Sequence, residues 1–454
     1  MTATLLPSAA PEAVHGLALE LRELLGPRRV TTEIRAREKA SLDGSTMSPV
    51  ISAQYPLGLA DLVAFPASAE EIAVVVAAAV RHGVPITTRG KGTGNYGQAI
   101  PMQGGLVLDT TKATAIVTVE DGLITAECGA RMIALETAAR ETGQQLWMYP
   151  STLQSTVGGF LGGGSGGTGT IKYGSNWNGF VAALDVVHAT PDAQLIHVEG
   201  ADSVPYVHSY GVGGVIARAT VRLEPLQDWR CVYASYPDFA GALGAVRELR
   251  KLDPLPRLVS ADPPALVGPM PDDPAIPKGR ASVRTILDAS TVDDAKAYFA
   301  STGGVVHDER TGPAAPMAVS MLSYNHGVWW LMQENPGKWF HIEVAGEALI
   351  DRIDEVQAVL PGAVLHIEAA HTVPIGMLAC QYEYPDQVFE GMDALGELGV
   401  GCHNPHQWFV DRDVEGVRAL AMRTDPSGLL NPGKWKAEDA PAAPPASAFY
   451  GSET

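Results

Sequence analysis

Glycine constrains the fold of this chain most, because many of its 48 glycines gather in two short stretches. One stretch runs from Gly90 to Gly97, and the other lies in PSTLQSTVGGFLGGGSGGTG, residues 150–169. Glycine adopts positive φ freely and lets the backbone approach a ligand closely, so such clusters predict ligand-binding loops. The alternatives are a structural turn at the first stretch and a flexible linker at the second. A linker is disfavoured because it would waste the apolar side chains of Leu153, Val157, Phe160 and Leu161.

Length and charge narrow the class of protein. A chain of 454 residues exceeds what one hydrophobic core normally organises, so two domains are expected. The formal net charge of −19 removes any general attraction to nucleic acid or to an anionic membrane. The four cysteines lack CxxC or metal-finger spacing, and no apolar run approaches the roughly 20 residues that span a bilayer. We therefore expect a reduced, cytoplasmic protein with no nucleic-acid partner and no membrane span.

The pattern of elements predicts two domains between disordered ends, residues 1–20 and 437–454. A helix is expected over 68–83, with Ser68 as its N-cap, Glu71 completing a capping box and Gly83 ending it. The strand 84–88 then leads into the first glycine stretch. Further expectations up to residue 227 are antiparallel strands at 105–109, 115–119 and from 123, a helix at 131–142, and strands at 181–189 and 212–226.

The pattern of expected secondary structure changes after about residue 228. Helical patterns at 239–252, 291–300 and 347–359 alternate with strands at 319–323, 339–344 and 362–367. This alternation predicts a second domain of helices on an antiparallel sheet.

Two G-x-G-x-x-G strings occur, but the common nucleotide-binding motifs do not fit them. A Rossmann fingerprint must open a helix, whereas Pro101 and Gly104-Gly105 follow the first string. No G-x-x-x-x-G-K-[ST] string exists, so a P-loop is excluded as well. A loop of backbone N–H donors beside Arg89 and Lys91 remains, which suits a pyrophosphate. The small Ser and Thr side chains of residues 150–169 suit a flat ligand with polar edges.

Five motifs in a fixed order carry a family resemblance. They are RGKGTG at 89–94, PSTLQSTVGG at 150–159, KYG at 172–174, GVGGVIARATVRL at 211–223 and DPSGLLNPGK at 425–434. In this order they resemble the FAD-linked oxidase superfamily of vanillyl-alcohol oxidase and p-cresol methylhydroxylase. The resemblance covers about residues 60–226 and 403–436.

This resemblance implies an α+β fold and FAD as the cofactor. It implies a two-subdomain FAD-binding domain over 21–227, an α+β substrate (cap) domain with an antiparallel sheet over 228–402, and a C-terminal return to the FAD-binding domain over 403–436. The first loop would bind the pyrophosphate through Arg89, Gly90, Lys91, Gly92, Thr93, Gly94, Asn95, Tyr96, Gly97 and Gln98. Flavin contacts would come from Pro150, Ser151, Thr152, Thr156, Gly158, Gly159 and Ser165. The resemblance also implies cofactor contacts from Gly169, Tyr173, Gly174, Val215, Ile216, Asn431 and Lys434.

One departure from the family pattern concerns covalent attachment of the flavin. Members with covalent flavin often have His in the first loop, where this chain has Thr93, and bicovalent members add Cys in the second loop, which has none here. We therefore expect dissociable FAD, although a His elsewhere in the chain stays available for attachment.

Candidate catalytic groups follow from the proton chemistry. Oxidation of a carbon beside oxygen needs a group that accepts the hydroxyl proton, usually His, Tyr or a carboxylate. HNPHQW, residues 403–408, is similar to a His-Trp element of sugar-lactone and alditol oxidases, which makes His406 the first choice and His403 the second. Tyr324 is a further candidate, and Arg412 is suited to an anionic substrate. For the two histidines the alternative is a satisfied surface or core imidazole, and for Arg412 it is a solvated charge.

Two other site hypotheses compete with these. HIEAAH, residues 366–371, together with HNPH offers metal ligands, but helix-spaced ligands are not evident and no metal is expected. Aromatic residues suited to a ring-shaped substrate are Trp329, Trp330, Trp339, Tyr382, Tyr384 and Trp408, although such residues are more often core.

The resemblance implies an FAD-dependent oxidase or dehydrogenase that transfers hydride from an alcohol-type carbon to flavin N5, with a phenolic or natural-product substrate as the leading prediction. Oxygen or another acceptor would take up the electrons. Hydroxy-acid or sugar-lactone oxidation is the alternative. The chain lacks the His-x-Gly-Asp-Gly-Asn-x-His metal motif of the glycolate and D-lactate branch, and this absence disfavours a 2-hydroxy-acid substrate. A non-redox or decayed flavin-binding protein is the alternative outside this class. The oligomeric state is open, with homodimers common in the family.

Overall fold

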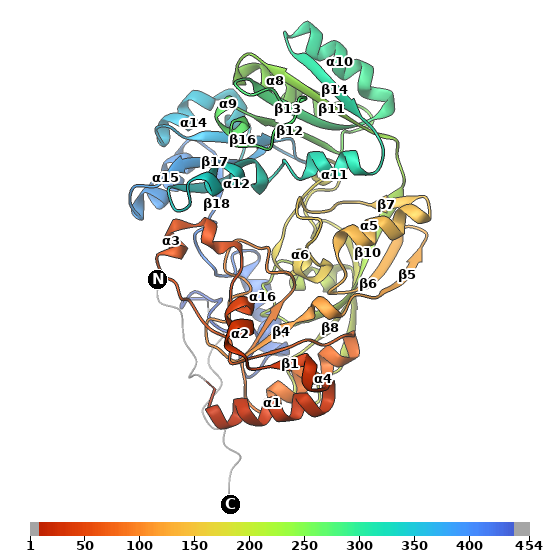
Figure 1. The fold of residues 1–454 in the computed structure, drawn as a ribbon, viewed down its shortest axis with the longest axis vertical. Coiled ribbons are helices and arrows are strands. Elements are labelled where there is room, and N and C mark those ends of the chain that lie inside the picture. Colours follow the sequence, from red (N-terminus) through yellow and green to blue (C-terminus); the bar gives the residue numbers. More distant parts are fainter. Residues whose placement is uncertain (1–8, 440–454) are drawn as a thin grey trace, which may run out of the picture.

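The computed structural model describes residues 9–439, which form three β-sheets arranged in a lower and an upper body (Figure 1). The expected disorder falls partly outside these residues, at 1–8 and 440–454. For the stretch from Pro11 the expectation is wrong, because helix α1 spans Pro11–Leu25. Proline at its first position and full burial of Leu17 and Leu21 stabilise this helix. The predicted α+β fold with an antiparallel cap sheet is confirmed.

The first sheet of the lower body has the strand order β1-β2-β4-β3. Its strands are β1 (Val30–Thr31), β2 (Leu62–Ala64), β3 (Ile86–Arg89) and β4 (Leu106–Asp109), accompanied by α2 (Ile34–Ala40), α3 (Pro49–Ser52) and α4 (Ala69–Arg81). Strand β4 pairs in parallel with β2 and β3, so the expected antiparallel role of 105–109 is wrong. Its neighbours are β2 and β3 of this sheet and not the hairpin that follows it in the sequence.

The second sheet is antiparallel and has the order β5-β6-β10-β8-β9, with β7 also pairing β10. Its elements are β5 (Ile116–Glu120), β6 (Leu123–Glu127), α5 (Met132–Glu141), β7 (Gln144–Leu146), β8 (Val181–Val187), β9 (Leu195–Glu199) and β10 (Val215–Pro225). Helix α4 lies against strands of both sheets and buries Ile72, Val75 and Val76 completely. The Ser68 hydroxyl accepts a hydrogen bond from the Glu71 N–H at 3.2 Å, which confirms the predicted cap.

Part of the second glycine stretch is helical, which the sequence analysis did not predict. Helix α6 (Val157–Gly163) begins after Thr156, whose hydroxyl accepts from the Gly159 N–H at 3.1 Å. Val157, Phe160 and Leu161 are buried at helical spacing, while Gly158, Gly159, Gly162 and Gly163 face a cavity. Packing of one apolar face therefore stabilises a helix whose other face carries only glycine. The short helix α7 (Thr170–Tyr173) follows.

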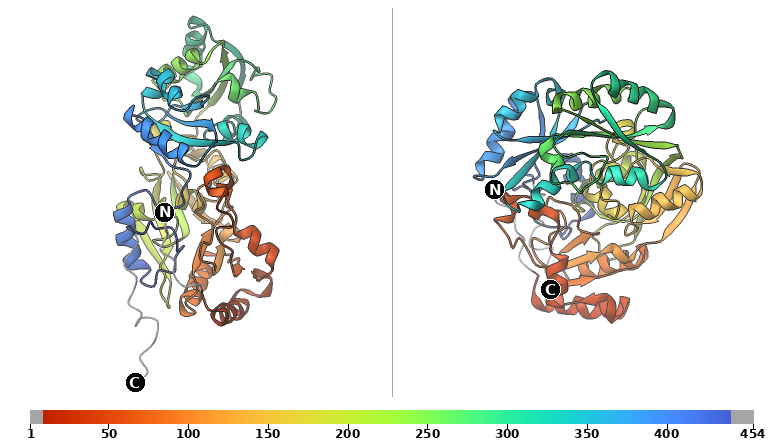
Figure 2. Two further views of the ribbon diagram at one scale, coloured as in Figure 1. Left: turned by 90° about the vertical axis from the view of Figure 1, so that its left-hand side faces the viewer. Right: turned by 45° about the horizontal axis from the view of Figure 1, so that its top comes forward.

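The upper body is built on an antiparallel eight-stranded sheet of order β14-β11-β13-β12-β16-β17-β15-β18. Its strands are β11 (Trp229–Tyr236), β12 (Leu258–Asp262), β13 (Ala281–Asp288), β14 (Val305–Arg310), β15 (Trp339–Ala345), β16 (Val364–Glu368), β17 (Ile375–Gln381) and β18 (Gly401–His403). Alternate residues of β11 enter two different cores, Val232 and Ala234 one and Cys231 and Tyr233 the other. Helices therefore cover both faces of this sheet (Figure 2, right).

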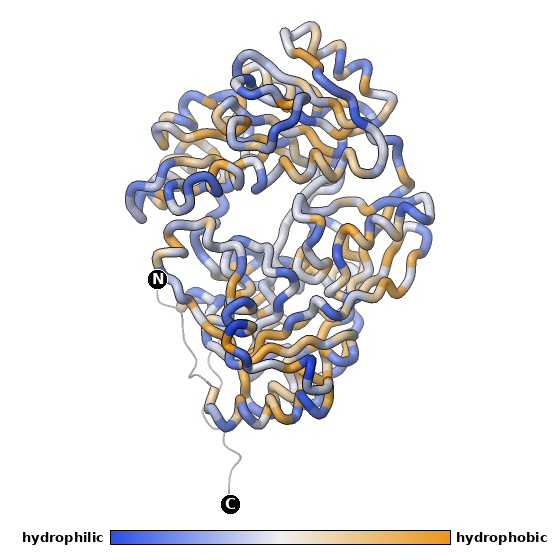
Figure 3. The backbone as a smooth tube through the Cα atoms, in the orientation of Figure 1, coloured by the Kyte–Doolittle hydropathy of each residue, from blue (hydrophilic) through white to orange (hydrophobic). Residues whose placement is uncertain are grey.

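On one face lie α8 (Phe239–Leu249), α10 (Val292–Ser301), α13 (Ala348–Asp351), α14 (Ile353–Val359) and α15 (Asp386–Glu397). On the other lie α9 (Pro264–Val267), α11 (Ala314–Ser320) and α12 (Asn325–Glu334). The strand expected at 319–323 is wrong, because these residues end α11 and form the turn into α12. Figure 3 shows hydrophobic residues running through the interior strands of both bodies.

The chain returns to the lower body after β18, and α16 (Val414–Thr424) lies on the outer side of the layer that holds β8 to β10 (Figure 2, left). Leu430 forms a parallel bridge with Ile86 of β3, the edge strand of the first sheet. Within residues 9–439, no helix is long and apolar enough to cross a membrane.

Candidate functional site

A cavity of about 1110 Å³ lies between the two bodies. It is lined by both glycine loops, by the start of β10 and by β15 and β17 of the upper body, which is called the cap below. Small-molecule pockets typically measure about 300–1,000 Å³, so this cavity has room for a large cofactor beside a small substrate.

Eight of the ten residues predicted in the first loop line the cavity: Gly90, Lys91, Gly92, Thr93, Gly94, Asn95, Tyr96 and Gln98. The loops approach each other so closely that a Cβ on Gly90 would lie 2.2 Å from the Thr156 hydroxyl oxygen. Gly92 has φ +63°, and a Cβ there would meet the Arg89 guanidinium at 2.2 Å. The glycines therefore allow a close approach of backbone that any side chain would block.

All seven residues predicted as flavin contacts in the second loop line the cavity: Pro150, Ser151, Thr152, Thr156, Gly158, Gly159 and Ser165. Tyr173, Gly174, Val215 and Ile216 line it as well. A Cβ on Gly162 would have no atom within 4 Å, so the glycine face of α6 opens directly onto the cavity. These bare backbone surfaces and small hydroxyl side chains fit a flat cofactor with a pyrophosphate, and FAD has this shape.

Five predicted cofactor residues do not line the cavity, because they support its loops from behind. They are Arg89, Gly97, Gly169, Asn431 and Lys434. The Asn431 amide donates to the carbonyl oxygens of Gln98 and Tyr210, and Lys434 Nζ donates to those of Gly97 and Ile100. Burial lowers the pKa of Lys434 to about 7.

The Arg89 guanidinium is turned out of the cavity and donates to the Leu42 carbonyl oxygen. Gly169 lies at φ +107°, and its N–H donates to the Arg257 carbonyl oxygen of the cap.

His403 lines the cavity between two carboxylates. Its Nδ1 lies 2.9 Å from Glu343 Oε2, and its Nε2 lies 2.7 Å from Asp411 Oδ2. Burial alone would lower the pKa of His403, but hydrogen bonds to Asp411 and Glu343 outweigh it and raise the pKa to about 10. Tyr96 donates its hydroxyl to Glu343, which joins the first glycine loop to this cluster.

His406, the first choice from the sequence, does not line the cavity. Its Nε2 donates to the His341 carbonyl oxygen at 2.8 Å, and its Nδ1 accepts from the Ser48 hydroxyl at 2.6 Å. Burial lowers the pKa of His406 to about 4. The geometry therefore favours His403 over His406 at the cavity, because both nitrogens of His406 are engaged in the protein interior.

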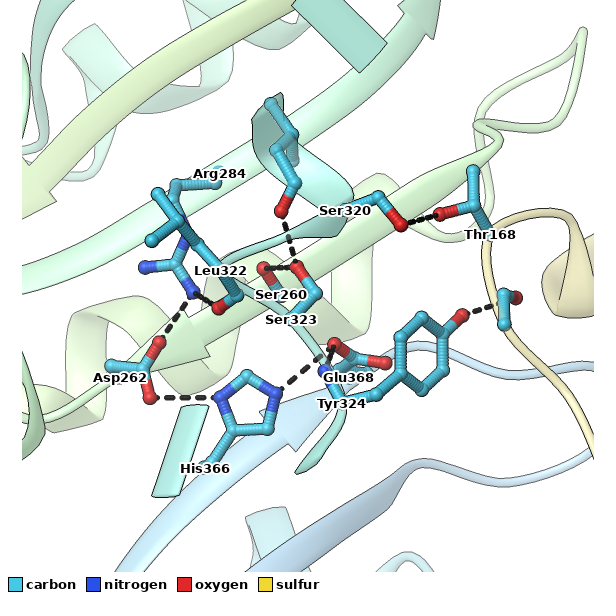
Figure 4. Close-up of polar contacts among 12 residues, drawn as sticks. Thr168, Ser260, Asp262, Arg284, Ser320, Leu322, Ser323, Tyr324, His366 and Glu368 are labelled. Atoms are coloured by element: carbon cyan, nitrogen blue, oxygen red, sulfur yellow. Dashed lines mark hydrogen bonds and ion pairs between the residues drawn. The ribbon is translucent and has the colours of Figure 1, made fainter. Parts of the chain in front are cut away.

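Tyr324 reaches the cavity from the turn before α12, at φ +56°. Its hydroxyl donates to the Gly167 carbonyl oxygen on the second glycine loop, and its N–H donates to Glu368 Oε1 at 2.6 Å. Figure 4 shows that Glu368 belongs to a buried chain that continues through His366. A backbone conformation that is strained for tyrosine is thus held by a fixed hydrogen bond.

The chain behind Tyr324 consists of buried charged groups on three neighbouring strands (Figure 4). His366 Nδ1 lies 2.8 Å from Asp262, and Arg284 donates to the other oxygen of Asp262. Burial alone would lower the pKa of His366, but Asp262 and Glu368 outweigh it and raise the pKa to about 9. The protonated imidazole therefore bridges two carboxylates.

Arg412 lines the cavity with its guanidinium carbon 4.5 Å from the centre of the Trp177 ring. One nitrogen donates to the Val207 carbonyl oxygen at 3.0 Å, and burial lowers the pKa of the guanidinium. Since a guanidinium has five N–H donors, several stay available for an anion.

The structure corrects two other expectations about the site. None of the six aromatic residues proposed for a ring substrate lines the cavity, whose aromatic residues are Tyr96, Phe160, Tyr173, Trp177, Tyr206, Tyr210 and Tyr324. The histidines of HIEAAH and HNPH do not converge among the described residues. Of the HIEAAH histidines, His366 is buried in the upper body and His371 reaches the cavity, while His403 of HNPH lines it and His406 does not.

Sequence reasoning missed Glu343, Asp411 and His208, all of which line the cavity. Asp411 follows HNPHQW by a few residues, and this proximity was a usable signal. Glu343 and His208 lie far from His403 in sequence, and only the fold brings them to it.

Residues 60–199 match a protein-family model described as an FAD binding domain. This part of the chain is therefore an FAD-binding domain, which confirms FAD as the cofactor and agrees with the resemblance.

Among curated proteins, D-lactate dehydrogenase of Archaeoglobus fulgidus is 33% identical over 207 residues, 43% of this chain and 46% of that protein. D-2-hydroxyglutarate dehydrogenase of Xanthomonas citri is 31% identical over 193 residues, 39% of this chain and 40% of that protein. The matches thus span less than half of either relative. The solved structure of alkyldihydroxyacetonephosphate synthase superposes with a TM-score of 0.73 over 95% of this chain and 89% of that one, at 17% identity, which shows a shared fold.

Proposed function

We propose that this chain is an FAD-dependent oxidoreductase that oxidises the hydroxyl-bearing carbon of a 2-hydroxy acid. The observation that carries the proposal is Arg412, a cationic side chain on the wall of the cavity that also holds both glycine loops. Relatives named as dehydrogenases of D-lactate and D-2-hydroxyglutarate support this substrate class. The hydroxy-acid alternative therefore replaces the phenolic substrate as the leading hypothesis, because these relatives are named as hydroxy-acid dehydrogenases.

FAD would be held without a covalent bond by residues on both loops. Backbone N–H groups of residues 90–94 would face the pyrophosphate, and the glycine face of α6 would lie against the cofactor. When bound, FAD supplies the acceptor for the hydride that leaves the substrate carbon. Acid precipitation that leaves the yellow colour in the supernatant would support dissociable FAD, and colour in the pellet would contradict it.

Arg412 would bind the substrate carboxylate. Its guanidinium is stacked on Trp177 and anchored at Val207, so the fork is oriented before the substrate arrives. A bidentate pair in a partly buried site is stronger than a neutral hydrogen bond and fixes the orientation of the acid.

Tyr324 would hold the hydroxyl end of the substrate from the cap side. Its position is set by Glu368 and by the Gly167 carbonyl oxygen, so the phenol cannot drift away from the second glycine loop. His403 would not accept the substrate proton, because both of its ring nitrogens already face carboxylates. It would instead hold Glu343 and Asp411 in place on the cavity wall.

Anaerobic bleaching of the flavin absorbance tests the function directly. The protein is mixed with D-lactate, glycolate, 2-hydroxyglutarate or an aryl alcohol, and at least one hydroxy acid is expected to bleach it. Arg412→Met should then raise the half-saturating concentration about 30-fold or more, since a charged hydrogen-bond partner in a buried site is worth about 2 kcal/mol or more. Bleaching by aryl alcohols alone would refute the substrate class. No bleaching by any donor would favour a non-redox flavin-binding protein.

A further inference from the structure

One wall of the cavity brings together three metal-ligating side chains from distant parts of the chain. His208 precedes β10, His403 ends β18, and Asp411 lies in the return to the lower body. One ligand atom from each lies within 4.8 Å of the other two. Among the residues that the structure describes, no other group of three His, Cys, Asp or Glu side chains meets this criterion.

The His208 ring is oriented as metal-binding imidazoles are. Its Nδ1 lies 3.0 Å from the Gly164 carbonyl oxygen, and because a carbonyl only accepts, Nδ1 carries the hydrogen. In a neutral ring Nε2 then carries a lone pair, and this nitrogen lies 3.7 Å from Asp411 Oδ1. This distance is too long for a hydrogen bond. A lone pair that faces a carboxylate oxygen is favourable when a cation lies between them.

The His403 ring has the same orientation. Its Nδ1 faces Glu343 Oε2 at 2.9 Å, and its Nε2 faces Asp411 Oδ2 at 2.7 Å. Metal-ligating histidines commonly donate Nδ1–H to a carboxylate or a backbone carbonyl, which fixes the tautomer and aims Nε2 at the ion. Here Glu343 provides one such partner and Gly164 the other. Glu343 is itself held by the Tyr96 hydroxyl.

We propose that His208 Nε2, His403 Nε2 and Asp411 bind one divalent transition-metal ion at the cavity wall, and that the ion displaces to solvent the proton otherwise held between His403 Nε2 and Asp411. Two imidazoles with one carboxylate suit borderline ions such as Zn²⁺, Mn²⁺ or Fe²⁺. Ligands at about 2.0–2.2 Å from a tetrahedral ion lie about 3.3–3.6 Å from one another. His403 Nε2 and His208 Nε2 lie 2.7 and 3.7 Å from the oxygens of Asp411, and all three ligand atoms lie within 4.8 Å of one another, so shifts of about an ångström would complete the site. The side of the ion that faces the cavity would stay open.

This ion would join the FAD-binding part, the cap and the C-terminal return at one point. Its ligand set differs from the His-x-Gly-Asp-Gly-Asn-x-His motif, which this chain lacks. The proposal does not depend on the substrate class, because it rests on the orientation of side chains that are present without any substrate.

The test is metal binding by the FAD-loaded full chain. Purified protein is stripped with a chelator and titrated calorimetrically with Zn²⁺ and with Mn²⁺, and its metal content is measured by mass spectrometry after desalting. We expect one ion per chain for at least one of the two metals. A wild-type chain that retains less than about a tenth of an equivalent of either metal would overturn the proposal without any variant.

Variants then locate the ion. Asp411→Asn should weaken binding by about 100-fold or more, and Glu343→Gln, which removes only the orienting partner of His403, by about 10- to 100-fold. His197→Gln is the matched control, because His197 pairs with Asp185 on the surface at 2.8 Å and should leave affinity unchanged. FAD content reports whether each variant still folds. Equal affinity in wild type and Asp411→Asn would place any bound ion elsewhere and refute the site.

Discussion

Asp262→Asn should destabilise the cap strongly, because Asp262 compensates two buried cations. Both the carboxylate and the Arg284 guanidinium are fully buried, and His366 binds the second oxygen at 2.8 Å. Removing one partner of such a pair typically costs about 3–5 kcal/mol, because the remaining charge stays buried without compensation. Asparagine keeps the shape but presents an N–H₂ group to one of two donors, so repacking does not relieve the loss.

The assay is thermal unfolding of the FAD-loaded protein, followed by circular dichroism. At about 2–4 °C per kcal/mol for a domain of this size, the loss corresponds to a fall in Tm of about 6–20 °C. Asp308→Asn is the matched control, since Asp308 pairs with Arg310 at a half-exposed site of the same sheet and should shift Tm by about 2 °C or less. A fall for Asp262→Asn no larger than that of the control would refute the argument that this network stabilises the cap.

Three further predictions concern the network and the loops. The pKa of His366 is raised to about 9 in the folded protein, so the stabilisation that its charge provides is complete below pH about 6.5 and is lost as the pH rises through about 9. Tm should therefore fall between pH 7 and 10, and it should fall less steeply in Asp262→Asn. A slope that is equal in both proteins would contradict this assignment. Gly90→Ala should weaken FAD binding at least about 10-fold in a fluorescence titration, since its Cβ would meet Thr156 at 2.2 Å, whereas Gly396→Ala on α15, with no atom within 4 Å, should have no effect. His406→Gln should leave the rate of flavin reduction within about 3-fold of wild type while lowering Tm by removing a buried hydrogen bond, and a loss of reduction beyond about 100-fold would return His406 to the mechanism.

Local signals in the sequence predicted what depends on local physics. The helix N-cap at Ser68 and helix α4 after it were predictable from residues close together in the sequence, and the structure has both. The glycine loops were recognisable because no other residue permits backbone to approach as closely as at Gly90.

Elements that depend on tertiary packing were harder to predict. Helix α6 forms although glycine costs about 1 kcal/mol per residue relative to alanine, because Val157, Phe160 and Leu161 are buried along one face. Residues 319–323 read as a strand from their apolar side chains, but the packing of α11 against β11 and β13 makes part of them helical. Short apolar runs do not distinguish the two structures.

The candidate site shows the same limit. His403 ends β18 and His406 follows three residues later, yet one faces the cavity and the other is buried against His341. Sequence reasoning identified residues 403–408 as part of the site but not which of the two histidines faces the cavity. Glu343 and His208, which approach His403 and Asp411 from other elements, carry no local signal of that contact.

The return of the chain to β3 also sets when the binding site can be completed during synthesis. The Ile86 N–H donates to the Leu429 carbonyl oxygen, and the Asn431 N–H donates back to the Ile86 carbonyl oxygen, each at 2.7 Å. Elongation at roughly 5–20 residues per second separates the two partners by about 17–70 s on the ribosome. A nascent chain that already contains both glycine loops therefore lacks the Asn431 and Lys434 bonds that support the first loop until residues 431–434 have been synthesised. A product released before residue 429 would keep the loops but not this support, so cofactor loading would distinguish chains that include residues 429–434 from shorter ones.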